Sequence, residues 1–155
     1  MCIRDRSGPE PQRTYLQEMI IEQAKTINKR FLIVGGETEN QADVELSSNI
    51  RFKSFMQSNE LNEVMVAAEM IVCRSGYSTI MDLAMIHKQA ILIPTPGQPE
   101  QEYLASYFEE KGIFYSQSQK EFDLGAAIKK ARNYTGINNQ YGIEQLDREV
   151  NKLLK

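Results

Sequence analysis

The 155-residue sequence has no tryptophan, one histidine and two cysteines, and each shortage argues against a class of chemistry. With His87 as the only histidine, a histidine-based metal site or a Ser-His-Asp triad has little support. Cys2 and Cys73 are too few for a disulfide framework, which favours a reduced, cytoplasmic setting. No apolar run approaches the roughly 20 residues that span a bilayer.

Positive charge is not in excess either, because 18 lysine and arginine residues stand against 21 aspartate and glutamate residues and the formal net charge is −3. The chain therefore has no general electrostatic attraction to nucleic acid. A composition of 41% hydrophobic and 25% charged residues is typical of a globular protein, and the length indicates one domain. Gly35-Gly36 lacks the G-x-G-x-x-G spacing of the dinucleotide-binding fingerprint. The P-loop motif G-x-x-x-x-G-K-[ST] is not present in the sequence either.

The first six residues, Met1 to Arg6, have no signal-peptide hydrophobic region. We interpret them as a non-native or disordered leader of the kind translated from adapter sequence. The native chain is then expected to extend further upstream. Residues 7–155 form the domain, which is expected to lack its first strand.

Short apolar runs alternate with segments of helical periodicity along the rest of the chain. The polar stretch 37–48 is predicted to be a loop. Strands are predicted at 31–34, 50–55, 70–73, 90–93 and 113–115, and helices at about 11–28, 60–68, 79–87, 100–111, 122–132 and 143–154. This alternation predicts an α/β fold with a Rossmann-like, doubly wound parallel sheet.

Two predicted strand-to-helix loops, 74–82 and 94–101, are rich in small and polar residues. They follow successive strands, so both are expected at the carboxyl edge of the sheet, where α/β proteins bind ligands. In the first loop Gly76 allows close backbone approach, and three hydroxyl residues offer hydrogen bonds to an anion: Ser75, Ser78 and Thr79. An ordinary serine or threonine helix cap explains the same residues.

Carboxylates and amides complete the candidate site. Asp82 lies one helical turn beyond Ser78 and can accept hydrogen bonds from a ribose diol, although it can also be a solvated acid in the first turn. In the second loop Gln98, Glu100 and Gln101 suit the hydroxyls of a sugar, or simply begin a helix.

A third candidate loop lies at Ser7-Gly8. Arg13 follows it in the chain and could neutralise a phosphate there. The alternative for this segment is a surface turn.

The two loops, in order and spacing, resemble the C-terminal domain of glycosyltransferase family twenty-eight, the MurG-like group. The segment Arg74-Ser75-Gly76 through Asp82 is similar to the family's Arg-Ser-Gly…Glu motif. The segment from Pro94 to Gln101 is similar to its proline-to-Gln-Gln loop. The similarity runs from about residue 7 to residue 112.

The resemblance implies the C-terminal half of a GT-B enzyme, in which this domain binds a UDP-sugar donor. By position, Ser75 and Gly76 would face the diphosphate, and Asp82 would replace a ribose-binding glutamate. Glu100 and Gln101 would replace paired glutamines near the sugar. Arg74 opens the motif and is included among the substrate-binding candidates.

The family transfers sugar with inversion and holds no metal; the implied ligand is the UDP-sugar, with no further cofactor. The catalytic base and the acceptor site usually belong to an N-terminal domain, so no catalytic residue is assigned in this chain. We interpret the chain as the donor-binding part of an inverting hexosyl- or N-acetylhexosaminyltransferase, a fragment inactive by itself.

Three alternatives to this interpretation stay open. They are a stand-alone subunit of a split glycosyltransferase, a non-hydrolysing UDP-sugar epimerase, and a nucleotide-binding module without catalysis. The missing half, or a partner subunit that supplies it, could bring the chain to the inner face of the membrane.

Overall fold

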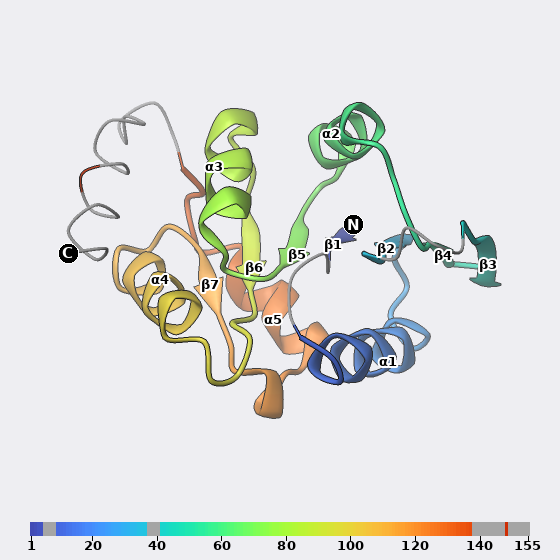
Figure 1. Ribbon diagram of the computed structural model, residues 1–155, viewed down its shortest axis with the longest axis horizontal. Helices are drawn as coiled ribbons and strands as arrows, with labels where there is room; N and C mark the ends of the chain where they lie inside the picture. The colour runs from blue at the N-terminus through green and yellow to red at the C-terminus, as the bar shows by residue number, and fades with distance from the viewer. Residues whose placement is uncertain (5–8, 37–40, 138–147, 149–155) are drawn as a thin grey trace.

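The computed structural model describes residues 1–4, 9–36, 41–137 and 148, which build a seven-stranded sheet covered by helices (Figure 1). The strand order is β3-β4-β2-β1-β5-β6-β7. The strands are β1 Cys2–Arg4, β2 Phe31–Val34, β3 Asp43–Ser47, β4 Ile50–Lys53, β5 Ile71–Cys73, β6 Ala90–Leu92 and β7 Tyr115–Ser116. All neighbouring strands are parallel except β3 and β4. The predicted α/β parallel sheet is therefore confirmed.

Helices lie on both faces of this sheet (Figure 1). Their bounds are α1 Gln12–Ala24, α2 Ser58–Ala67, α3 Tyr77–Ile86, α4 Pro99–Glu110 and α5 Leu124–Ala131, with a short 3-10 helix η1 at Gln119–Glu121. One hydrophobic cluster joins α1 and α5 to the sheet, and a second joins α2, α3 and α4 to its other face. This double covering explains why β5 and β6 consist wholly of buried residues.

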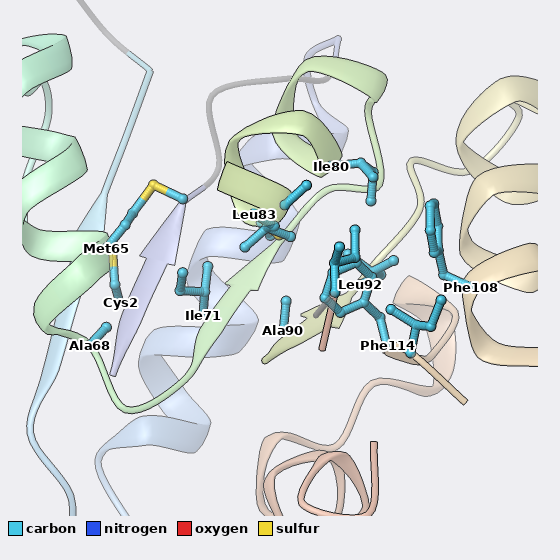
Figure 2. Close-up of a cluster of buried hydrophobic side chains, with 14 of the residues drawn as sticks. Cys2, Met65, Ala68, Ile71, Ile80, Leu83, Ala90, Leu92, Phe108 and Phe114 are labelled. Atoms are coloured by element: carbon cyan, nitrogen blue, oxygen red, sulfur yellow. The ribbon is translucent and has the colours of Figure 1, made fainter. Parts of the chain in front are cut away.

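Figure 2 shows the cluster beneath α2, α3 and α4. Leu83 of α3 is fully buried in it, as is Leu92 of β6. Phe108 and Phe114 pack with their ring centroids 5.5 Å apart. Cys2 belongs to the same cluster, and burial raises the pKa of its thiol to about 11. The thiol is therefore protonated at neutral pH and packs as a small apolar group.

The expectation that the chain lacks its first strand is wrong. β1 lies in the middle of the sheet and pairs in parallel with both β2 and β5. Three residues suffice because Cys2 and Ile3 point to opposite faces and enter the two separate clusters. Residues 2–4 are thus an ordered strand. The non-native origin of residues 1–6 stays a prediction.

The polar stretch 37–48 was also assigned wrongly as a loop throughout, because it contains β3. β3 is an edge strand with an almost wholly exposed burial pattern, so its polar composition is compatible with a strand. Asp43 on β3 forms an ion pair with Arg51 on β4 at 2.8 Å. The predicted helix at 143–154 lies outside the described residues, except for position 148.

Candidate functional site

The carboxyl ends of the central strands meet at one edge of the sheet. Cys73 at the end of β5 is in register with Arg4 of β1 on one side and Leu92 of β6 on the other. The loops that lead into α1, α3 and α4 therefore leave the sheet at the same edge. This arrangement confirms the expectation that the loops 74–82 and 94–101 lie next to each other.

The start of α3 is open. Gly76 is its N-cap, and a Cβ added there would meet nothing within 4 Å. Ser78 in the first turn is exposed. Among the described residues, no group accepts a hydrogen bond from the backbone amides of Ser78 and Thr79. Free amides and the positive end of the helix dipole make such a terminus suitable for an anion.

Asp82, one turn along α3, borders a pocket of about 270 Å³. Its carboxylate accepts a hydrogen bond from Nη1 of Arg4 at 2.6 Å, and about half of its side chain is exposed. The first turn of α2 supplies Ser58 and Asn59 to the same pocket. The complete lining is Arg4, Ser58, Asn59, Leu61, Asn62, Met65 and Asp82. Asp82 can therefore offer an oxygen to a polar ligand held between α2 and α3.

Three other candidate residues lie inside the protein, where they join the two loops. The hydroxyl of Ser75 is fully buried and donates to the carbonyl of Gln101 at 2.7 Å. The side chain of Gln101 accepts from the amide of Thr95 at 2.9 Å and donates to Gln98 at 2.6 Å. Arg74, 1% exposed, donates to the carbonyls of Ile93 and Pro94 at 3.3 and 3.4 Å. These side chains fix the shape of the loops.

The remaining candidates lie around this edge. Glu100 is exposed in the first turn of α4, while Gln98 is partly buried just before it. Arg13 lies in the first turn of α1 and forms an ion pair with Glu10 at 2.6 Å. Ser7 and Gly8 lie outside the described residues, so their expected role stays a prediction.

Sequence reasoning missed several residues of the pocket. Arg4 was assigned to a leader, and Ser58, Asn59 and Asn62 carried no recognised motif. A usable signal was present, because the segment after β4 is another strand-to-helix junction that ends in polar residues. The same rule that selected 74–82 would have selected 54–62.

The described residues contain no group of three or more His, Cys, Asp or Glu side chains that could hold a metal ion. Within the same part of the chain, no helix has both the length and the apolar character needed to cross a membrane.

The fold is that of a Rossmann-like domain of GT-B glycosyltransferases. The solution structure of ALG13 superposes with a TM-score of 0.65 and 12% identity, covering 99% of this chain and 93% of that one. MurG from Acinetobacter baumannii superposes with a TM-score of 0.62 and 17% identity, covering 86% of this chain and 42% of that one.

The sequence identifies the family. Residues 12–147 match the glycosyltransferase family 28 C-terminal domain, and the chain belongs to this family. A relative from Caldanaerobacter subterraneus subsp. tengcongensis is 27% identical over 127 residues, which are 74% of this chain and 34% of the relative. That relative is named UDP-N-acetylglucosamine--N-acetylmuramyl-(pentapeptide) pyrophosphoryl-undecaprenol N-acetylglucosamine transferase. The chain thus spans about a third of the length of this relative.

Proposed function

We propose that this chain is the donor-binding part of an inverting glycosyltransferase that moves a hexose or N-acetylhexosamine from a UDP-sugar to an acceptor. The observation that carries the proposal is the open start of α3 on the same helix as Asp82, whose carboxylate borders a pocket one turn further along. Family membership supports a nucleotide-sugar as the ligand, and the name of the Caldanaerobacter relative includes UDP-N-acetylglucosamine.

In this proposal the diphosphate binds at the start of α3. The amides of Ser78 and Thr79 donate to its oxygens, and Gly76 leaves room for them. The dipole of an exposed helix end contributes about 0.3–1 kcal/mol, and more where the site is partly buried. The same groups stabilise the charge that develops on the diphosphate as the sugar leaves.

Asp82 accepts hydrogen bonds from the ribose diol in this arrangement. Arg4 already bonds one carboxylate oxygen, which orients the group towards the pocket and leaves the other oxygen for the ribose. The exposed Glu100 at the start of α4 is the remaining candidate for the sugar. Gln101 serves the sugar only indirectly, because its amide holds the loop.

The acceptor and the catalytic base belong to the part of the enzyme outside this chain. This division agrees with the chain's coverage of about a third of the Caldanaerobacter relative. The missing part is either an N-terminal domain or a partner subunit, and it would carry the assembly to the inner face of the membrane.

A stand-alone subunit of a split glycosyltransferase is the second candidate. The ALG13 structure favours it, because that chain is matched over 93% of its length by this single domain. A non-hydrolysing epimerase and a nucleotide-binding module remain as outcomes of the test. Product analysis with the full-length protein separates them, as transfer to an acceptor, sugar inversion without one, or binding alone.

Calorimetric titration of the 155-residue chain tests donor binding directly. We expect UDP to bind more tightly than uridine, because only UDP reaches the start of α3, and more tightly than other nucleoside diphosphates. Equal and negligible heats for all these ligands would contradict the proposal. Tight binding of every diphosphate with no preference for uracil would reduce it to an anion site.

A further inference from the structure

Four loops at the carboxyl edge are tied together by two buried side chains. Arg74 follows β5 and reaches the loop after β6 through Ile93 and Pro94. Its other terminal nitrogen, Nη2, donates to the backbone carbonyl of Gln12 at 3.2 Å, at the start of α1. Gln119, after β7, donates to the side-chain oxygen of the same Gln12 at 2.9 Å.

Both tying residues lie deep in the protein, with 1% of Arg74 and 6% of Gln119 exposed. Neither therefore offers its donors to a ligand. A guanidinium presents several donors in a rigid planar fork, which allows Arg74 to hold two segments at once. A lysine has the same charge but no fork, so it cannot reproduce these bonds.

We infer that Arg74 and Gln119 are positioning residues, which hold the loops of the proposed donor site in register without touching the donor. Arg74 precedes Ser75 and Gly76 directly, so its anchors set where the first turn of α3 begins. The inference rests on the proposed function for its consequence on ligand binding. The arrangement of the loops can be measured without any ligand.

Backbone hydrogen exchange of the ligand-free chain tests the positioning role. In R74K we expect the amides of Thr95 and Gln98 to exchange about tenfold faster or more, since their loop loses its anchors. The matched control is N49A, because Asn49 caps the far end of α1 through three carbonyls at the opposite edge of the sheet. N49A lowers global stability and should leave exchange in the 94–98 loop unchanged once that loss is subtracted.

Affinity for UDP provides the second measurement, at a temperature where every variant is folded. We expect R74K to bind about tenfold more weakly than the parent and N49A to bind normally. Q119A, which cuts only the link to Gln12, should loosen the start of α1 and weaken binding by a smaller factor. It also keeps the inference testable if R74K does not fold.

The results test the positioning role of Arg74 and Gln119 separately from the proposed binding of the donor. Unchanged loop exchange in R74K, or equal changes in R74K and N49A, would overturn the positioning role; if R74K does not fold, unchanged exchange at the start of α1 in Q119A would do so. If the parent chain does not bind UDP, the proposed function fails while the exchange data still judge the positioning role. Faster loop exchange with unchanged UDP affinity would place the ligand away from these loops and overturn the inferred consequence for binding.

Discussion

The helix starts at the carboxyl edge fall into two kinds. At the start of α1 and in the loop before α4, nearby side chains accept backbone amides and close the segment: Glu10 accepts the amide of Thr14, and Glu102 accepts the amide of Gly97. The starts of α2 and α3 are open among the described residues. The first turn of α2 lines the pocket that contains Asp82, and α3 reaches the same pocket through Asp82 itself, one turn beyond Ser78. A closed segment has backbone donors that its own side chains satisfy, whereas an open helix start keeps its donors for a ligand.

This difference separates residues that build the site from residues that could bind in it. The loop before α4 looks as polar as the loop before α3. Yet the side chain of Gln101, in the first turn of α4, is directed inwards and accepts the amide of Thr95. Polar residues at a strand end therefore do not by themselves define a contact surface. The comparison predicts that changes in the closed loop alter stability and that changes in the open one alter affinity.

The largest effects are expected at Asp82 for affinity and at Gln101 for stability. D82A should weaken UDP binding by about 1–3 kcal/mol, the range for loss of a charged hydrogen-bond partner. The control E110A removes an exposed carboxylate at the far end of α4 and should not alter binding. Calorimetry measures both, and an unchanged affinity in D82A would remove Asp82 from the site.

Q101L should lower the free energy of unfolding by about 1–3 kcal/mol, because the buried amide of Thr95 loses its acceptor. Urea denaturation measures this change. S78A serves as the comparison at the open start of α3, where the free energy of unfolding should remain that of the parent. If Q101L instead kept the parent's stability and lost UDP binding, Gln101 would belong to the contact surface and the distinction between the two loops would fail.

Sequence patterns were sufficient for the parallel sheet and the two loops, because buried apolar strands and apolar residues at helical spacing have recognisable local signatures. β1 and β3 were missed for opposite reasons. β1 is too short to show a pattern, and its burial depends on pairing with the distant β2 and β5. β3 is an exposed edge strand whose composition is that of a loop.

Within the site, sequence could indicate which residues gather at the edge but could not indicate their direction. Ser75 and Ser78 are the same residue type three positions apart. Ser75 is buried against the carbonyl of Gln101, whereas Ser78 is exposed. That outcome depends on the contact between α4 and the loop before α3, which no local pattern contains.

Two glycines give a smaller and sharper contrast. Gly97 has a φ of 77°, so G97A should cost about 1–2 kcal/mol of unfolding free energy through left-handed strain. Gly76 has an ordinary φ of −71° and open space around it, so G76A should fold normally and lose affinity for UDP to the added methyl group. Thermal unfolding and calorimetry of the pair measure this. The reverse result, with G76A unstable or G97A defective only in binding, would contradict the comparison.

The smallest effect concerns the closed start of α1. The hydroxyl of Thr14 and the nearby Arg13 hold the pKa of Glu10 below its ordinary value. Because the folded pKa is lowered, the stabilisation is present above the unfolded pKa and is lost as the pH falls through the folded one. The carboxyl is exposed, so the expected change is slight. Urea titrations of the parent and E10Q between about pH 3 and pH 6 should show a shallower pH dependence in E10Q. Identical slopes would show that Glu10 does not close this helix start, and α1 would then join α2 and α3 as an open one.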